Sequence, residues 1–352
     1  MVKDVTMCHS ATIYSQICQD SRKMARVLDS VLARNLPWQF RIDPLNIIMG
    51  AWNQSRALAW LCAISLVMAT SLQFWEGDVR TNILAMKNGT YNPFREFNEW
   101  LNDLFFGLIG LSSLVNTVYK SVPDSHTAYY LVCYLRDLVA GTMVYWITGG
   151  IWHLTIYGVF GKSLFKDRNR EFPDPALIRT QQWHAQTSLF IYAMLPVLSE
   201  ILIENKVTKV YFYVDEIGGW GQYAAYFLLY IACVEVGIYW MHRILHTNKW
   251  LYNNIHGPHH LYKTKDMLTP WASIAFHPLD GILQACPYVI FLHVVPVHYF
   301  THFILLFFSG VWATNIHDAM WLDSEPIMGA KYHTLHHTHY MYNFGQFFTF
   351  CD

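Results

Sequence analysis

The sequence predicts an all-α protein, built as a multi-span membrane helical bundle. Hydrophobic residues make up 53% of the 352 residues and charged residues only 14%, about half of the ~25% that is typical of soluble domains. Several apolar runs approach or exceed the roughly 20 residues that a helix needs to cross a bilayer. The net charge of −1 gives no basic field for nucleic acid, so we expect a lipid bilayer as a partner and no nucleic acid.

The chain begins with a polar extension, residues 1–56. It carries seven basic residues against four aspartates and no apolar core of the length found in secretory signals. We expect it to be cytosolic and partly ordered. The seven cysteines of the whole chain are scattered, with no C-x-x-C pair, which indicates neither a disulfide framework nor a zinc ribbon.

Residues 57–125 are predicted to be an additional membrane-associated segment. The apolar run Ala57–Phe74 is near the length of a span, and the shorter run Leu104–Val118 either spans or lies at the interface. The polar loop 76–103 between them contains a glycosylation sequon at Asn88. That sequon is usable only if the loop is lumenal.

Three further apolar runs follow. Tyr129–Phe160 is too long for one crossing and predicts either an overlong, tilted span or a helical hairpin. The basic loop Lys162–Gln182 favours the cytosolic side by the positive-inside rule. Thr187–Ile203 and Tyr223–Met241 are predicted spans, and the second leads directly into His242.

The last long apolar run, Ile282–Trp312, is broken by Pro287 and Pro296. It predicts a hairpin of two shallow helices that returns to the side it left. This return is required if the histidines that follow are to meet those that precede it. His298 and His302 fall near the apex of the hairpin, where we expect interfacial residues rather than metal ligands.

Eight histidines are concentrated in three short clusters with spacings H-x3-H, H-x2-H-H and H-x2-H-H. Residues three or four apart on a helix share one face, and neutral imidazole is a common metal ligand. Eight ligands exceed the four that a structural zinc ion takes, so the pattern predicts two metal ions between converging helices. The clusters are His242 and His246; His256, His259 and His260; and His333, His336 and His337.

Three other side chains are candidates for the same site. His277 and His317 each have an acid nearby, Asp280 and Asp318, and carboxylates commonly accept the distal N–H of a metal-bound histidine. Glu235 lies two helical turns before the first cluster and within a predicted span. It either supports the metal site or a path for electrons and protons, or it is a paired structural acid.

The ligand set and its surroundings also indicate a class of chemistry. An all-imidazole site is neutral and leaves two divalent metals with their full charge, which favours binding of oxygen. Beside a bilayer the natural substrate is an apolar lipid. Together these features predict the oxidation of an unactivated C–H bond.

The motifs HRILH, HGPHH and HTLHH, with AFHPLDGILQ, NIHD and NFGQFFT, resemble the fatty acid hydroxylase/sterol desaturase superfamily. Within it the chain is similar to plant-type sterol C-5 desaturases, also called Δ7-sterol 5(6)-desaturases or lathosterol oxidases. The resemblance covers roughly residues 126–352, which we expect to form the desaturase domain. Family members continue beyond the position of Asp352, so the resemblance also implies a truncated C-terminus.

The resemblance implies a multi-pass protein of the endoplasmic reticulum membrane whose helical bundle carries a histidine-rich di-metal cap on its cytosolic face. The implied cofactor is a pair of iron ions, with O2 as oxidant and electrons from NAD(P)H through cytochrome b5. By resemblance, the eight clustered histidines are ligands and His317 is a further one. Trp321 stands where related hydroxylases have another histidine, and His277 is the candidate to replace it.

The implied function is the introduction of the C5(6) double bond into Δ7-sterols, in sterol biosynthesis. Sterol C-4 methyl oxidation and fatty acid or sphingolipid hydroxylation on the same scaffold are alternatives, because hydroxylation and desaturation begin with the same hydrogen abstraction. A non-catalytic zinc-binding membrane protein is a third possibility, since imidazole sites bind zinc readily.

Overall fold

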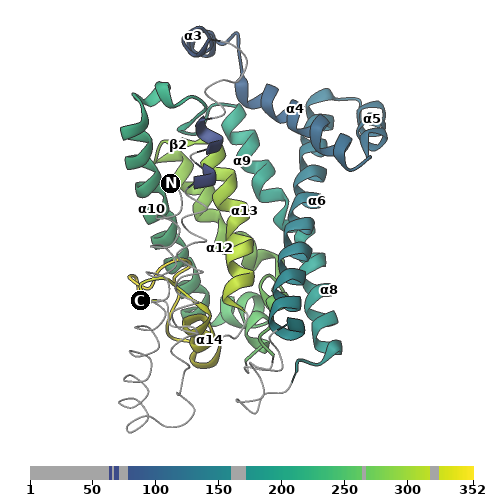
Figure 1. Cartoon of the computed structure of the whole chain (residues 1–352), viewed down its shortest axis with the longest axis vertical. Helices are drawn as coiled ribbons and strands as arrows, with labels where there is room; N and C mark the ends of the chain where they lie inside the picture. The colour runs from purple at the N-terminus through teal and green to yellow at the C-terminus, as the bar shows by residue number, and fades with distance from the viewer. Residues whose placement is uncertain (1–62, 66, 71–77, 160–171, 264–266, 318–324) are drawn as a thin grey trace, which may run out of the picture.

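The computed structural model describes residues 63–65, 67–70, 78–159, 172–263, 267–317 and 325–352. Within these ranges the regular secondary structure is almost entirely helical (Figure 1), which confirms the predicted all-α class. Two short strands, β1 (Val210–Tyr211) and β2 (Val297–His298), pair in parallel. The extension 1–56 and most of the run Ala57–Phe74 lie outside the described residues.

The helical elements follow one another with short connections. The first half of the described chain contains α3 (Val79–Lys87), α4 (Pro93–Leu108), α5 (Ser112–Ser121), α6 (Ser125–His153), the π-helical turn η2 (Leu154–Val159), α8 (Pro175–Tyr192) and α9 (Met194–Glu204). The second half contains η3 (Val214–Ile217), α10 (Trp220–Thr247), α11 (Lys249–Leu251), η4 (Tyr252–His256), η5 (His259–Leu261), η6 (Pro270–Ala272), α12 (Pro278–Ile290), η7 (Phe291–His293), α13 (Tyr299–Ile316) and α14 (Ala330–His339).

The described part of the run Tyr129–Phe160 is α6 continued by η2, rather than a hairpin. Asp124 caps the start of α6 by accepting a 2.7 Å hydrogen bond from the Thr127 N–H, and the helix continues to His153. Gly149 does not break it. A Cβ at this position would lie 2.7 Å from the ring of Trp271, so the glycine allows η6 to pack closely against α6.

The run Leu104–Val118 is not one continuous span. The helix ends after Leu108, Gly110 adopts a φ of +73°, and α5 starts at Ser112 in a new direction (Figure 1). The polar stretch 76–103 is helical over much of its length, because α3 and most of α4 lie there. The reason is local, since Asp78 and Asn92 cap the two helices with their side chains.

Three stretches of the described chain are long and apolar enough to cross a membrane: Pro175–Glu204, Trp220–Thr247 and Tyr299–Ile316. They include the predicted spans Thr187–Ile203 and Tyr223–Met241, and α10 extends beyond its predicted bounds at both ends. The predicted loop Lys162–Gln182 ends earlier than expected, because Asp174 caps a helix that begins at Pro175.

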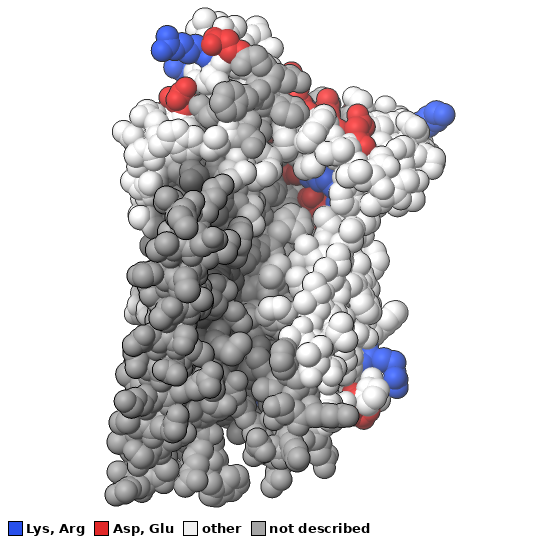
Figure 2. All heavy atoms as spheres, in the orientation of Figure 1, with Lys and Arg blue, Asp and Glu red and all other residues white. Residues whose placement is uncertain are grey.

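The surface of α6 and α8 is consistent with a lipid-facing wall. In Figure 2 the charged side chains of the described residues gather toward the two ends of the molecule, and the α6 surface between them is uncharged. Large apolar side chains are exposed on these two helices, among them Trp146, Ile147, Ile151 and Phe190. Such a band is unusual for a protein surrounded by water.

The predicted hairpin over Ile282–Trp312 is confirmed as α12 and α13, joined by η7 and β2. The interfacial placement of His298 and His302 is wrong, because both are buried. His302 contacts the Tyr230 hydroxyl and the Ser199 hydroxyl at 3.0 Å each. The β1–β2 pair and the neighbouring helices enclose this connection, so its histidines face protein instead of the interface.

The hairpin brings distant parts of the chain to one end of the bundle. The C-terminal end of α10, the turns η4 and η5, the end of α13 and helix α14 meet there, at the end opposite α3 to α5 (Figure 1). These are the elements that carry the clustered histidines. The main hydrophobic core lies between α10, α12 and α13 and contains Tyr230, Ile238, Tyr288 and Trp312.

Candidate metal centre

The clustered histidines form two separate groups. Within each group, one ring nitrogen of every residue lies within 4.8 Å of those of all the others. The five-histidine group contains His242, His246, His256, His260 and His336. The four-histidine group contains His259, His317, His333 and His337. The structure thus brings together all eight histidines of the three clusters and adds His317.

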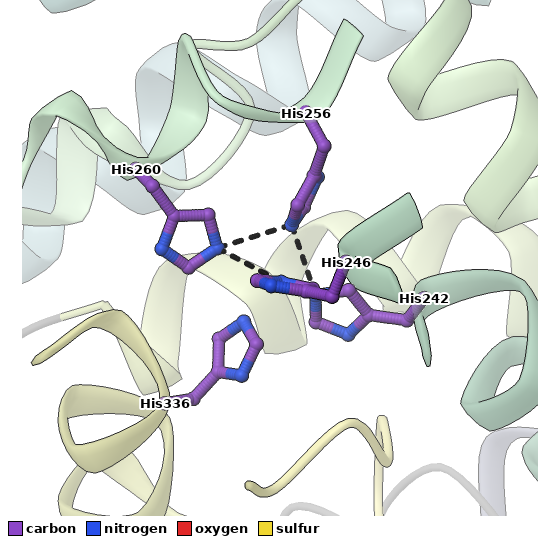
Figure 3. A group of neighbouring side chains, drawn as sticks. All are labelled: His242, His246, His256, His260 and His336. Atoms are coloured by element: carbon purple, nitrogen blue, oxygen red, sulfur yellow. Dashed lines mark hydrogen bonds between the residues drawn. The ribbon is translucent and has the colours of Figure 1, made fainter. Parts of the chain in front are cut away.

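The five-histidine group is assembled from four elements. His242 and His246 lie one turn apart on the last two turns of α10, while His256 comes from η4 and His260 from η5. His336 reaches them from α14, and Figure 3 shows all five rings converging. The i, i+4 spacing on α10 places two imidazoles on one helix face.

A tight reversal after α10 places the second cluster. Asn248 ends α10 and caps α11 by accepting hydrogen bonds from the N–H groups of Trp250 and Leu251. Gly257 follows the π-helical turn, and a Cβ there would lie 2.8 Å from the Tyr252 carbonyl oxygen. Only glycine fits this close backbone approach, so the H-G-P-H-H sequence directs the chain back over the end of α10.

The four-histidine group is built at the junction of α13 and α14. His317 is the C-terminal cap of α13, and His333 and His337 lie one turn apart on α14. His259 completes the set from η5. The two neighbours His336 and His337 therefore belong to different groups, because consecutive residues on a helix point in different directions.

The partners of the Nδ1 atoms fix the tautomers in the five-histidine group. His242 Nδ1 lies 3.1 Å from the Phe344 carbonyl oxygen, and His256 Nδ1 lies 2.7 Å from Asp280 Oδ2. Carbonyl and carboxylate oxygens accept hydrogen bonds, so both Nδ1 atoms carry a hydrogen, and in a neutral imidazole this leaves the lone pair on Nε2. These two Nε2 atoms face each other at 3.2 Å.

Two other histidines, His317 and His336, also donate from Nδ1 to an oxygen acceptor and turn Nε2 toward the centre of their group. His317 Nδ1 donates to the Ala313 carbonyl at 2.7 Å, yet its Nε2 lies 2.9 Å from that of His333. His336 Nδ1 donates to the Tyr342 carbonyl at 2.7 Å, and its buried Nε2 has no hydrogen-bond partner among the described residues. Lone pairs that converge in this way fit a cation between the rings, so both groups fit a metal ion.

Burial keeps these imidazoles neutral. It lowers the pKa of five of them far below the usual range for histidine, and the neighbouring imidazoles of the site lower it further. It lowers the pKa of His317 to about 4. The five are His259, His260, His333, His336 and His337. At neutral pH their lone pairs are therefore available for metal binding without loss of a proton.

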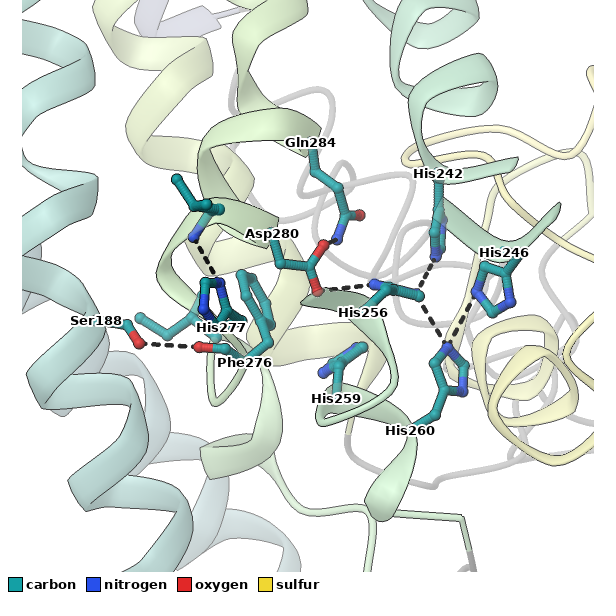
Figure 4. Close-up of polar contacts among 12 residues, drawn as sticks. Ser188, His242, His246, His256, His259, His260, Phe276, His277, Asp280 and Gln284 are labelled. Atoms are coloured by element: carbon teal, nitrogen blue, oxygen red, sulfur yellow. Dashed lines mark hydrogen bonds and ion pairs between the residues drawn. The ribbon is translucent and has the colours of Figure 1, made fainter. Parts of the chain in front are cut away.

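Asp280 supports the site, but through a different histidine from the one expected. Its buried carboxylate accepts from His256 Nδ1 and is held by the Gln284 amide at 2.8 Å. His277, which was expected to be its partner, caps α12 by accepting from the Leu279 N–H at 3.2 Å. Figure 4 shows its ring apart from the histidine rings. Within the described chain His277 belongs to neither group.

Glu235 is buried. Within the part of the chain that the structure describes, its carboxylate accepts hydrogen bonds from the backbone N–H groups of Gln346, Phe347 and Phe348 and from no histidine ring. Asp318 and Trp321, the other two residues named with this site, lie outside the described residues.

Sequence reasoning missed the backbone acceptors of the site. The carbonyl groups of Ala313, Tyr342 and Phe344 fix the orientation of three rings. Every residue has a carbonyl, so no sequence signal marks these. Asp280 was expected to be a supporting carboxylate, but its partner is His256 rather than the neighbouring His277.

An apolar cavity of about 210 Å³ opens beside the two groups. Rings of both groups line one part of it, including His242 and His333. Most of the remaining wall is apolar and comes from α6, α8, α9, α12 and α13, with Leu189, Leu195, Ala285, Tyr288, Leu306 and Gly310. The arrangement can hold an apolar molecule against the metal centre and exclude water from it.

Comparisons with known proteins agree with this geometry. The family model described as "Fatty acid hydroxylase" matches residues 227–352. A putative Delta(7)-sterol-C5(6)-desaturase 2 of Arabidopsis thaliana is 41% identical over 224 residues, which cover 64% of this chain and 79% of the relative. The Delta(7)-sterol-C5(6)-desaturase of Nicotiana tabacum is 41% identical over 224 residues, 62% of this chain and 80% of the relative.

An animal protein is similar over a shorter part of the chain. The lathosterol oxidase of Rattus norvegicus is 38% identical over 208 residues, 56% of this chain and 66% of the relative. No solved structure matches the chain.

Proposed function

Because this chain belongs to the fatty acid hydroxylase/sterol desaturase family, we propose that it is a sterol desaturase that introduces the C5(6) double bond into Δ7-sterols. The observation that carries this proposal is the contact between two buried all-histidine groups and an apolar cavity. Sterols are apolar over most of their surface, and a cavity with this wall matches such a substrate better than a polar one.

We propose that each histidine group binds one iron ion. The ligands would be the nine histidines of the two groups defined above, and His277 is not among them. An iron pair supplies the O2-dependent removal of two hydrogen atoms from neighbouring carbons. The reaction balances when the sterol gives up two electrons and an external donor gives two more, so that O2 leaves as two molecules of water.

The chain's own residues hold and shape this centre. The histidine lone pairs point at the metal positions, so these rings do not serve as general bases for the substrate. Asp280 and the Phe344 carbonyl keep His256 and His242 in the correct tautomer and orientation. The apolar wall formed by Leu189, Ala285 and their neighbours positions the lipid and keeps bulk water away.

The cellular setting is part of the proposal. Electrons would come from NAD(P)H through cytochrome b5, and the site would face the cytosol from the endoplasmic reticulum membrane. The desaturase domain would comprise residues 126–352, with 57–125 as an additional membrane-associated segment and 1–56 as a cytosolic extension.

Sterol profiling tests the function. The gene is expressed in a host that lacks its own C-5 desaturase, and the H336A variant expressed at the same level is the control. We expect Δ7-sterol to be converted to the Δ5,7-sterol by the unchanged protein and not by the variant. Continued accumulation of Δ7-sterol in both would contradict the proposal.

The same experiment separates the alternatives. A hydroxylated lipid, or a sterol oxidised at its C-4 methyl group, would assign the scaffold to one of the related reactions. Metal analysis of the purified protein adds a second criterion. One zinc per chain, no iron and no oxygen uptake would identify a non-catalytic zinc protein. Zinc alone would not decide between the candidates, because imidazole sites bind zinc readily during isolation.

A further inference from the structure

The segment Tyr342–Phe348, called the C-terminal loop here, provides the acceptors that orient two histidines of the five-histidine group. The Phe344 carbonyl accepts from His242 Nδ1 at 3.1 Å, and the Tyr342 carbonyl accepts from His336 Nδ1 at 2.7 Å. The Phe344 ring also packs against both imidazoles. The position of this loop therefore decides the orientation of two proposed ligands.

Two carboxylates hold the loop by its backbone. Asp352 accepts from the N–H groups of Phe344 and Gly345 at 2.7 and 3.2 Å. Glu235 accepts from the next three, at 2.9 Å from Gln346, at 2.9 Å from Phe347 and at 3.1 Å from Phe348. Five consecutive N–H groups thus point at two acids. Charged acceptors of this kind bind such a run of backbone donors strongly.

Glu235 is the more deeply placed of the two acids. It is fully buried in α10, on the helix that also carries His242. The loop passes so close that a Cβ at Gly345 would lie 2.8 Å from Glu235 Oε1. Both oxygens of the carboxylate are occupied by loop N–H groups, and the residue is not among those lining the cavity. This arrangement favours positioning over a role in proton transfer or substrate contact.

From these contacts we propose that Glu235 is a positioning residue for the five-histidine group. It acts through the C-terminal loop, which holds the Nδ1–H groups of His242 and His336. The four-histidine group takes its orienting contact from Ala313 instead and does not depend on Glu235 in the same way. The proposal rests on the metal centre proposed above, and it predicts a selective effect on one of two metal positions.

Cobalt(II) titration of the purified, metal-free protein in detergent tests this proposal, with visible absorption as the readout. We expect two binding phases for the unchanged chain. H336A should weaken the phase of the five-histidine group and H259A that of the other, which assigns them. E235Q retains the size of the side chain but turns an amide NH2 toward backbone donors. It should weaken the five-histidine phase by about 10–100-fold and leave the other phase unchanged.

E216Q is the matched control. Glu216 also accepts from two backbone N–H groups, those of Phe212 and Tyr213, but at the other end of α10. It should leave both cobalt phases and their affinities unchanged. The thermal unfolding temperatures of metal-free E235Q and E216Q are compared to detect a general loss of structure.

Two outcomes would overturn the proposal: wild-type cobalt binding in E235Q, or equal weakening of both phases, as a merely structural role predicts. If E235Q does not fold, E235D decides, because it keeps the buried charge but withdraws the carboxylate from the loop N–H groups by one methylene. Selective weakening in E235D supports the proposal and unchanged binding refutes it. Failure of the unchanged chain to bind any cobalt would instead contradict the metal centre itself.

Discussion

The Nε2 atoms of His242 and His256 face each other at 3.2 Å, and the Nδ1 atoms of both rings donate to oxygen acceptors. In neutral imidazoles this leaves a lone pair on each Nε2, and two lone pairs at this distance repel each other unless a cation lies between them. We therefore interpret the two rings as a pair of metal ligands.

Removal of one histidine from either group should abolish activity. H259A reduces the four-histidine group to three ligands, and H336A reduces the five-histidine group to four. We expect sterol conversion to fall below detection for both, while membrane insertion stays normal. Sterol profiles and membrane fractionation measure this. The exposed His293 is the control, and H293A should behave like the unchanged protein. Turnover that survives H259A or H336A would contradict the site.

Asp280 and His277 lie on the same turn of α12 and should behave differently. D280N removes the charged acceptor of His256 Nδ1 and should lower metal affinity about 10–100-fold. H277A removes only a helix cap and should cost about 1 kcal/mol of unfolding free energy, with both metals retained. Metal titration and thermal unfolding of the two variants distinguish these effects. Loss of metal in H277A would restore this residue as a ligand.

Acidification should destabilise the metal-free protein. The pKa of His317 is about 4 in the folded chain and about 6.5 when unfolded, so between these values the unfolded state binds the extra proton. Folding stability must then fall as pH drops from about 6.5 to about 4, by up to about 1.4 kcal/mol per pH unit for one histidine. Five more histidines shift in the same direction.

Thermal unfolding of the metal-free protein at several pH values measures this effect. An unfolding temperature that stays constant or rises between pH 6.5 and pH 4.5 would contradict the burial of neutral imidazoles. H317Q removes one titrating imidazole, so the change in unfolding temperature with pH should be smaller by the contribution of one bound proton.

Substitutions at Gly310 test the role of the cavity, because this residue lines the cavity and belongs to neither histidine group. A Cβ at this position of α13 meets no atom within 4 Å, and the residue lines the cavity. G310A should therefore fold normally and gain up to about 1 kcal/mol from its helix propensity. G310F should fill the cavity and strongly reduce sterol turnover while iron content stays unchanged. Normal turnover in G310F would show that the substrate binds elsewhere.

The proposed orientation can be checked at Asn88. This exposed sequon follows α3, which contacts the region before α10 through Lys206–Met86 and Asn82–Tyr213 hydrogen bonds. The histidines lie at the opposite end of α10, whose 28 residues span about 42 Å at 1.5 Å per residue. That length exceeds the ~30 Å hydrocarbon core. A cytosolic metal site therefore implies a lumenal Asn88.

We expect a glycan on Asn88 that endoglycosidase removes, seen as a mobility shift in gels. The shift should disappear in N88Q and persist in N53Q, which removes the sequon at Asn53 in the extension. Absence of any shift in the unchanged protein would contradict the orientation.

Local patterns predicted much of this protein because they depend on neighbours in sequence. The spacing of His242 and His246 fixes one helix face wherever the helix lies. The lengths of the apolar runs predicted α10 and the α12–α13 hairpin, since a span must match the membrane. The same reasoning failed for Leu104–Val118, where the backbone turn at Gly110 divides a run that looks continuous.

The sequence by itself determined the helical class, the residues that cluster and the need for a returning hairpin. Only the tertiary structure decided that His336 and His337 serve different groups, that Asp280 supports His256, and that Glu235 holds the C-terminal loop. These relations depend on how α14 and the loop dock against α10, which local spacing does not specify. The orienting carbonyls of Phe344 and Ala313 carry no side-chain signature at all, because every residue has the same backbone group.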